Sequence, residues 1–174
     1  MLLSLYIKIY IKSIVILTKS EEIKMDRTEK ARELFHNGYN CAQAVVGAYS
    51  DLFDVEPELA MRMIEGFGGG MGRMRLTCGA VSAMVALVGM KYSKGVADDT
   101  ETRTLIYGKV RELAGAFREQ NGTIVCGELL GLVGNENESA KPDERTKQYY
   151  EKRPCAECVT DCAKIVERLL LDCE

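Results

Sequence analysis

The chain has 174 residues, of which 47% are hydrophobic and 28% are charged, and this composition is typical of a soluble globular protein with one domain. Its net charge of −3, without a dense cluster of lysine or arginine, excludes a typical nucleic-acid-binding module. Seven cysteines are an odd number, so at least one thiol stays unpaired, and we expect a reducing, cytoplasmic compartment with functional thiols.

The first 25 residues differ in composition from the rest of the chain. The segment before Met25 contains no glycine, alanine, aspartate, arginine or cysteine. We interpret residues 1–25 as an extension that results from an over-extended start site, with a weak membrane anchor as the alternative. Lys8 and Lys12 interrupt its apolar stretch, and a central lysine costs about 2.5–3.5 kcal/mol on insertion, which disfavours a membrane span. Residues 26–174 are expected to form a single helical domain.

From Asp26 onward, apolar residues recur with helical spacing. Asp26 or Thr28 can cap a first helix, which Gly38 ends. Asn40 then caps a second helix and opens a capping box with the glutamine three residues later. Pro57 suits the first turn of a third helix.

A glycine-rich segment at residues 66–72 interrupts this pattern, because such a density of glycine cannot form a stable helix interior. The segment lacks the lysine that ends a phosphate-binding P-loop, and it does not follow a strand. We interpret it as a turn where backbones or a cofactor approach closely. The candidate cofactor-binding glycines are Gly68, Gly69, Gly70 and, beyond the turn, Gly79.

Residues 78–92 are apolar nearly all round, and a helix without a polar face belongs in the centre of a bundle. A longer amphipathic helix extends from Asp98 or Asp99 to Gly122.

A short helix begins at Cys126, residues 134–150 are expected to form an exposed irregular loop, and Pro154 starts the last helix. No long stretch alternates with a period of two. The sequence therefore predicts an all-α fold, a compact bundle of about five to six helices with residues 78–92 at its centre.

Four cysteines lie where predicted helices begin: Cys41, Cys78, Cys126 and Cys155. The free N–H groups and the dipole of a helix N-terminus favour thiolate over thiol. If these four helix ends converge, their thiolates suit an iron–sulfur cluster or a tetrahedral zinc ion, whereas two of them suit a dithiol/disulfide pair. These four residues are thus both the candidate catalytic residues and the candidate metal ligands. The plain alternative is that each is a small buried hydrophobic residue.

The other candidate residues carry weaker signals. Cys158 and Cys162 share a helix face with Cys155, but a cluster-binding loop is normally irregular and no βαβ unit surrounds the Cys-x-x-Cys pair, so we interpret them as accessory or packing residues. Cys173 has no assigned role. His36 is the only histidine, which argues against hydrolase triads and histidine-rich metal sites, and we expect it at the surface.

The motifs occur in a characteristic order along residues 28–170, and each is short: Asn40-Cys41-Ala42-Gln43, Gly66-Phe67-Gly68-Gly69-Gly70-Met71-Gly72, Cys78-Gly79-Ala80, Cys126-Gly127-Glu128, and a cysteine that opens the last helix. This set resembles the C_GCAxxG_C_C family of redox-active proteins. The resemblance implies that Cys41, Cys78, Cys126 and Cys155 occupy the four cysteine positions of the family. Ala83 stands where the family motif has glycine. The family is also similar to a domain of split-Soret cytochromes c, which implies an iron–sulfur centre; the haem attachment motif is absent here.

The sequence therefore predicts an electron-transfer protein or oxidoreductase whose four cysteines form one redox site. An iron–sulfur cluster is favoured over a cycling disulfide. The alternatives are a structural zinc site in a helical module without redox activity and a plain helical interaction protein. The redox partner, the substrate and the oligomeric state are not identified.

Overall fold

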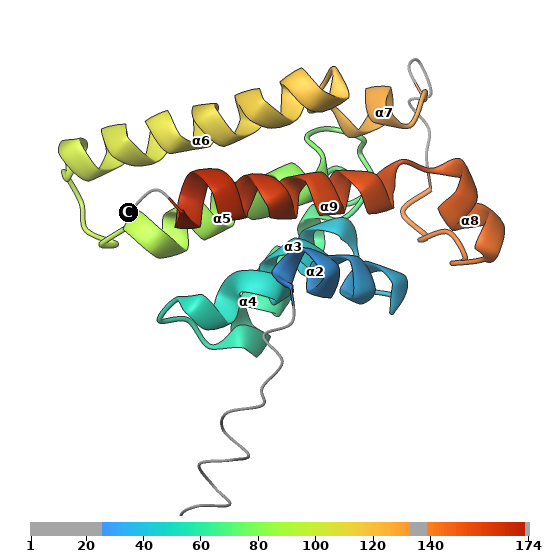
Figure 1. The fold of residues 1–174 in the computed structure, drawn as a ribbon, viewed down its shortest axis with the longest axis horizontal. Helices are drawn as coiled ribbons and strands as arrows, with labels where there is room; N and C mark the ends of the chain where they lie inside the picture. Colours follow the sequence, from blue (N-terminus) through green and yellow to red (C-terminus); the bar gives the residue numbers. More distant parts are fainter. Residues whose placement is uncertain (1–25, 133–138, 173–174) are drawn as a thin grey trace, which may run out of the picture.

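The computed structural model describes residues 26–132 and 139–172, and within these ranges the chain forms helices and no β-strand (Figure 1). The all-α prediction is confirmed. The α-helices are α2 (Arg27–His36), α3 (Cys41–Tyr49), α4 (Pro57–Ile64), α5 (Gly79–Tyr92), α6 (Thr100–Asn121), α7 (Cys126–Leu129), α8 (Lys147–Lys152) and α9 (Cys155–Val166). Two 3₁₀ turns, η1 (Ser50–Leu52) and η2 (Glu65–Phe67), follow α3 and α4, and a π-helical turn, η3 (Glu167–Leu171), extends α9.

Side-chain caps fix the starts of the first helices, as the sequence indicates. The carboxylate of Asp26 accepts a hydrogen bond from the backbone N–H of Thr28 at the start of α2. At the start of α3, Asn40 accepts from the N–H groups of Ala42 and Gln43, and the Gln43 side chain accepts from the N–H of Asn40. This is a complete capping box, and it fixes where Cys41 lies.

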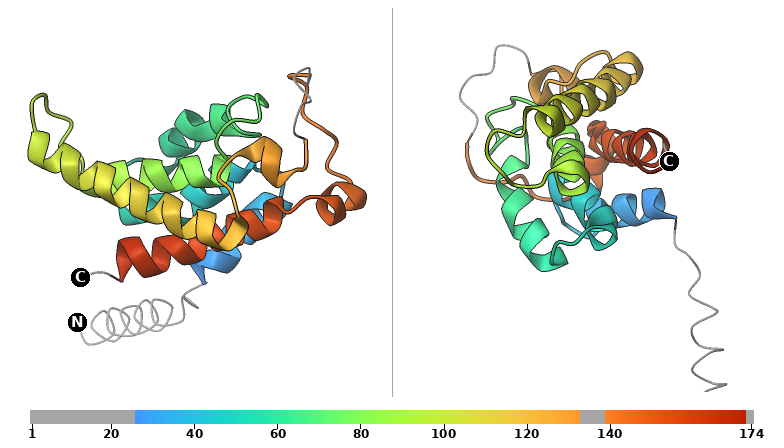
Figure 2. Two further views of the ribbon diagram at one scale, coloured as in Figure 1. Left: turned by 90° about the horizontal axis from the view of Figure 1, so that it is seen from above. Right: turned by 90° about the vertical axis from the view of Figure 1, so that its left-hand side faces the viewer.

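Helices α5 and α9 lie between α6 on one side and α2, α3 and α4 on the other (Figures 1 and 2). Helix α3 packs against α2, α5 and α9, and α5 also contacts α6. The largest fully buried side chains come from these helices and include Phe35, Tyr49, Met84, Leu87 and Phe117. The hydroxyl of Tyr49 donates a hydrogen bond to the carbonyl oxygen of Ala163 at 3.0 Å, which satisfies its one buried polar group and ties α3 to α9.

Helix α5 differs from the expected fully enclosed helix in two respects. It begins at Gly79, so Cys78 is the N-cap residue rather than the first helical residue. One edge of the helix is also open, since Val85 is 40% exposed and lines, with Met90 and with Met63 of α4, an apolar groove of about 540 Å³.

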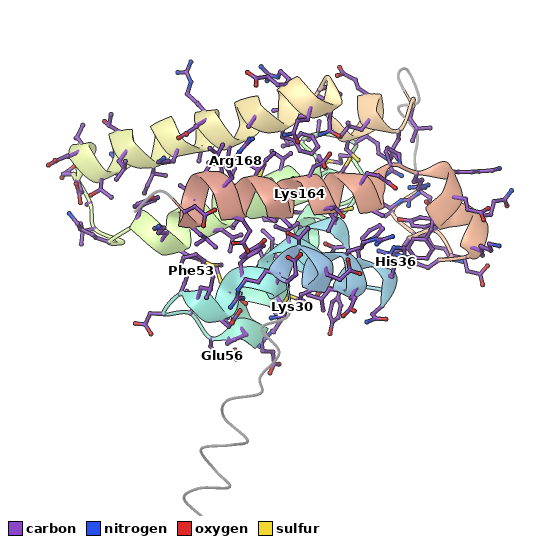
Figure 3. The ribbon with its side chains drawn as sticks, viewed as in Figure 1. Lys30, His36, Phe53, Glu56, Lys164 and Arg168 are labelled. Carbon is purple, nitrogen blue, oxygen red and sulfur yellow. The ribbon has the colours of Figure 1, made fainter. Side chains whose placement is uncertain are left out.

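The segment between α7 and α9 is more ordered than the predicted irregular loop at residues 134–150. Thr146 caps helix α8, and the Thr146 hydroxyl accepts from the N–H of Tyr149. Aromatic packing holds α8 against α2: the ring of Tyr150 packs edge-on against that of Phe35, with 5.7 Å between the ring centroids. His36, labelled in Figure 3, is exposed, as expected. Its ring centroid lies 4.8 Å from that of Tyr150. The part of the predicted loop before Ser139 lies outside the described residues.

Among the described helices, none combines the length and the apolarity that crossing a bilayer requires. The expectations for residues 1–25 concern a segment outside the described residues.

Candidate functional site

Five cysteines from four parts of the chain line one small cavity. They are Cys41, Cys78, Cys126, Cys155 and Cys158. We call this space the cysteine cavity; its volume is about 10 Å³, which is room for no more than about one water molecule. The four cysteines singled out from the sequence are thus brought together, and Cys158 joins them.

Each of the four lies at a helix start. Cys41, Cys126 and Cys155 are the first residues of α3, α7 and α9, and Cys78 is the N-cap of α5. Cys158 lies on α9 three residues after Cys155, a spacing that places the two on the same face of the helix.

A short backbone pairing brings Cys78 next to Cys126. Thr77 and Val125 form an isolated antiparallel bridge. On either side of it, the N–H of Cys78 donates to the carbonyl oxygen of Ile124 at 2.8 Å, and the N–H of Cys126 donates to that of Leu76 at 2.6 Å. The bridge therefore clamps the starts of α5 and α7 together, although the two cysteines are far apart in the sequence.

The glycine-rich turn allows this close packing. Gly70 has a φ of +71°, and a Cβ atom added there would lie 2.6 Å from Cβ of Cys126 and 2.9 Å from the backbone nitrogen of Leu76. A Cβ atom at Gly79 would lie 2.8 Å from the carbonyl oxygen of Phe67. Gly69, Gly70 and Gly79 line the cysteine cavity, whereas Gly68 packs against the Asn40 side chain beside it. These contacts are between protein atoms, and the cofactor-binding role of the four glycines stays a prediction.

We expect Gly70→Ala to destabilise the protein, because alanine at this φ is strained and its methyl group would clash with Cys126. The strain alone is worth about 1–3 kcal/mol in the free energy of unfolding. Gly108→Ala, in the middle of α6, is the matched control: an added Cβ meets nothing within 4 Å there, and alanine is the better helix former by up to about 1 kcal/mol. Denaturant unfolding of the three proteins checks this. A Gly70→Ala variant as stable as wild type would show that the close approach to Cys126 is not required.

The thiols of the cavity interact in two pairs, Cys41 with Cys155 and Cys78 with Cys158, and within each pair one pKa is raised and the other is lowered. The hydrogen bond between Cys41 and Cys155 raises the pKa of Cys41 well above its ordinary value and lowers that of Cys155. The hydrogen bond from Cys158, together with the N–H groups of Ala80 and Val81 at the start of α5, lowers the pKa of Cys78 to about 7. The same bond and burial raise the pKa of Cys158. Each pair thus joins a thiolate-prone sulfur to a thiol that keeps its proton.

The pKa of Cys126 shifts in the opposite direction to the pKa values of Cys78 and Cys155. Burial, and then the charge of Cys78, raise its pKa to about 11, although Nη1 of Arg75 lies 4.0 Å from its sulfur and acts in the opposite direction. At Cys41 and Cys126 the pKa shifts upward, against the preference of a helix N-terminus for a thiolate. Burial and competition for the proton outweigh the helix terminus at these two positions.

Sequence reasoning set Cys158 aside as an accessory residue, and the structure places it in the cavity wall. The available signal was its spacing of three from Cys155 on a helix. Cys162, one turn further, is fully buried in the apolar core, and burial raises its pKa well above the ordinary value. It does not line the cavity. Cys173 lies outside the described residues.

A second, larger cavity adjoins the first and shares Cys41, Cys126 and Cys155 with it. Its volume is about 380 Å³. Four arginines line it, and we call it the arginine cavity: Arg73, Arg75, Arg145 and Arg153. These arginines come from the segment after the glycine turn and from the chain on either side of α8, and sequence reasoning did not identify them as a group.

The thiols have the right chemistry for a metal or a cluster, since cysteine sulfur suits zinc and iron–sulfur centres. Within the ranges that the structure describes, however, no three cysteine, histidine, aspartate or glutamate side chains are arranged so that they could hold a metal ion. The metal-binding role of Cys41, Cys78, Cys126 and Cys155 therefore stays a prediction.

Comparison with known proteins gives one match. The protein family described as "Putative redox-active protein (C_GCAxxG_C_C)" matches residues 39–169, which include every cysteine of the cysteine cavity. No curated protein and no solved structure is significantly similar to the chain.

Proposed function

The chain belongs to the C_GCAxxG_C_C family, described as redox-active, and from this membership and the geometry of its cysteines we propose that it is a thiol redox protein. The protein cycles between a dithiol and a disulfide form, with Cys41 and Cys155 as the pair that reacts first. The observation that carries the proposal is that Cys41 and Cys155, the first residues of α3 and α9, line both the cysteine cavity and the larger cavity beside it. The interaction between the two thiols raises the pKa of Cys41 and lowers that of Cys155.

This arrangement meets the requirements of thiol–disulfide exchange. The thiolate is the attacking species, and a second thiol must then resolve the mixed disulfide. Cys155 supplies the first and Cys41 the second. Both also line the arginine cavity, so a reactant can reach them, whereas Cys78 and Cys158 line only the inner cavity. We assign the inner pair to a second dithiol that exchanges with the first.

An iron–sulfur electron-transfer centre is the second candidate. It is favoured by the number of thiols around one space and by the family resemblance. Cys41, Cys78, Cys126 and Cys155 would hold the cluster, which would supply one-electron transfer. The dithiol is preferred because Cys41 and Cys155 also line the larger cavity, which gives a reactant access to this pair.

Anaerobic purification followed by thiol titration, an absorption spectrum and metal analysis tests both candidates. The dithiol proposal expects a metal-free protein that loses thiols two at a time on mild oxidation, with Cys41 linked to Cys155 in the first disulfide found by peptide mapping. Visible absorption bands with stoichiometric iron would replace it by the cluster. Zinc alone would indicate a structural site, and inert, metal-free thiols would reject a redox role.

A further inference from the structure

We propose that the arginine cavity binds a small disulfide with carboxylate groups, and that this molecule is the oxidant reduced by Cys41 and Cys155. The inference rests on the proposed thiol redox function and adds the chemical class of the substrate. It is carried by the position of the cavity, its size and its charge.

The position and size of the cavity suit a small molecule that must touch the reactive thiols. A volume of about 380 Å³ lies in the range of small-molecule sites, roughly 300–1,000 Å³. Cys41, Cys126 and Cys155 form part of its wall. A disulfide bound there lies against these three cysteines, and it cannot enter the inner cavity, which has room for about one water molecule.

The charge of the cavity wall is opposite to that of the whole chain. The lining contains four arginines and two carboxylates, those of Glu65 and Asp143, so it is positively charged. The whole chain, in contrast, has a net charge of −3. The arginines are partly shielded from solvent; the side chains of Arg73 and Arg153 are only 16% and 22% exposed. A guanidinium group in such a place binds a carboxylate through two parallel N–H···O bonds.

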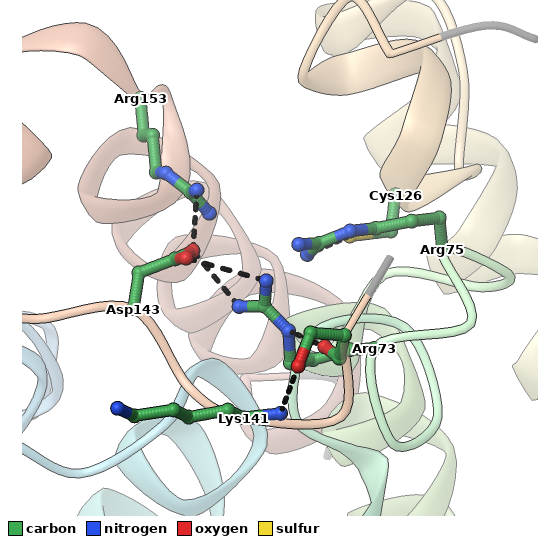
Figure 4. A network of polar contacts seen from close by, with 7 residues as sticks. Arg73, Arg75, Cys126, Lys141, Asp143 and Arg153 are labelled. Atoms are coloured by element: carbon green, nitrogen blue, oxygen red, sulfur yellow. Dashed lines mark hydrogen bonds and ion pairs between the residues drawn. The ribbon is translucent and has the colours of Figure 1, made fainter. Parts of the chain in front are cut away.

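Asp143 shows how these arginines hold a carboxylate. Its two oxygens accept hydrogen bonds from Arg73 at 2.8 and 3.3 Å, and one of them also accepts from Arg153 at 2.7 Å (Figure 4). Arg75 extends toward the same region from the side of Cys126 (Figure 4). The cavity therefore contains a carboxylate-binding arrangement next to the thiols, and Asp143 competes with a bound anion for two of its arginines.

The bound disulfide is itself the oxidant, so the reaction needs no other reactant. The Cys155 thiolate attacks one sulfur of the disulfide, forms a mixed disulfide and releases the other half as a thiolate, which takes up a proton. Cys41 then loses its proton and attacks the sulfur of Cys155, which releases the second half as a thiol. The bound disulfide is reduced to two thiols, and Cys41 and Cys155 are oxidised to one disulfide.

The test compares three small disulfides that differ in charge, in single-turnover reactions with the reduced full-length chain. The probes are 3,3′-dithiodipropionate, which is a dianion, the neutral bis(2-hydroxyethyl) disulfide and the dicationic cystamine. We expect the dianion to react at least about tenfold faster than the neutral probe at low salt, and cystamine to react more slowly than either. The ratio of dianion to neutral rates should fall as salt is added, because salt screens the arginines.

Two variants should move this ratio in opposite directions. Arg75→Gln removes a positive charge from the cavity wall and should lower the ratio by about fivefold, whereas Asp143→Asn removes the competing carboxylate and should raise it by a similar factor. Arg118→Gln, an exposed position near the end of α6, is the control and should leave the ratio unchanged. Because the ratio cancels differences in thiol reactivity and in the folded fraction, it stays informative if a variant is less stable.

The outcomes separate the two proposals. If no disulfide oxidises the protein, the thiol redox function itself is wrong. If all three probes react at similar rates, or if both variants leave the ratio at the wild-type value, the thiol function stands and the arginine cavity is not the substrate site.

Discussion

Replacing Cys155 by serine is expected to slow the reaction of the reduced protein with a small disulfide by about a thousandfold or more, as is found when an enzyme loses its nucleophile. Serine cannot supply a thiolate. Burial, which also raises the pKa of Cys41, remains in the variant, so Cys41 does not replace Cys155 as the thiolate. Stopped-flow mixing with bis(2-hydroxyethyl) disulfide measures the rate. This neutral probe makes the result independent of the charge of the arginine cavity.

The partner and control variants make the experiment specific. Cys41→Ser should keep the attack by Cys155 but lose the resolving step, so that the mixed disulfide on Cys155 accumulates and is found by mass spectrometry. Cys162→Ala is the matched control, because Cys162 is buried on the same helix but does not line the cavity, and its rate should match wild type. A Cys155→Ser variant that reacts at the wild-type rate would exclude Cys155 as the attacking residue.

The helix starts could be predicted from the sequence because their signals are local. Asn40 and its capping box define the start of α3 within one turn, so the position of Cys41 follows from a few neighbouring residues. Helix α5 starts one residue later than the sequence predicts, with Cys78 as its N-cap. The N–H of Cys78 donates to the carbonyl oxygen of Ile124, a long-range bond that no local pattern encodes. The sequence predicts a close approach at the glycine turn, and at Gly70 the approaching group is the Cβ atom of Cys126.

The pairing of the thiols could not be predicted, because it depends on how the helices pack. Cys41 meets Cys155 because α3 packs against α9, and Cys78 meets Cys158 because α5 also contacts α9. The arginine cavity was missed for a similar reason. Asp143 and Arg145 lie in a segment predicted to be an irregular loop, and their partners Arg73 and Phe35 are far away in the sequence.

The stability of the reduced protein is expected to rise between about pH 7 and pH 9 and to fall above pH 9. The pKa of Cys78 is lowered from 9.0 to about 7 in the folded state, so in this window the folded protein has lost a proton that the unfolded chain still binds. Stability rises with pH wherever the unfolded state binds more protons, by about 1 kcal/mol per pH unit for one such group. The lowered pKa of Cys155 acts in the same direction.

Above pH 9 the stability decreases as the pH rises. A neighbouring thiol and burial raise the pKa values of Cys41 and Cys158. Burial raises those of Cys126 and Cys162. These thiols keep their protons in the folded protein while the unfolded chain loses them, so each further step in pH favours unfolding. Urea unfolding under anaerobic, reducing conditions from pH 6 to pH 10 measures the curve. Cys78→Ala should lose most of the rise, whereas Cys162→Ala should keep the rise and show a shallower fall. A wild-type curve that is flat or falling between pH 7 and pH 9 would mean that the start of α5 and Cys158 do not stabilise a thiolate at Cys78, and the inner pair would then be two ordinary buried thiols.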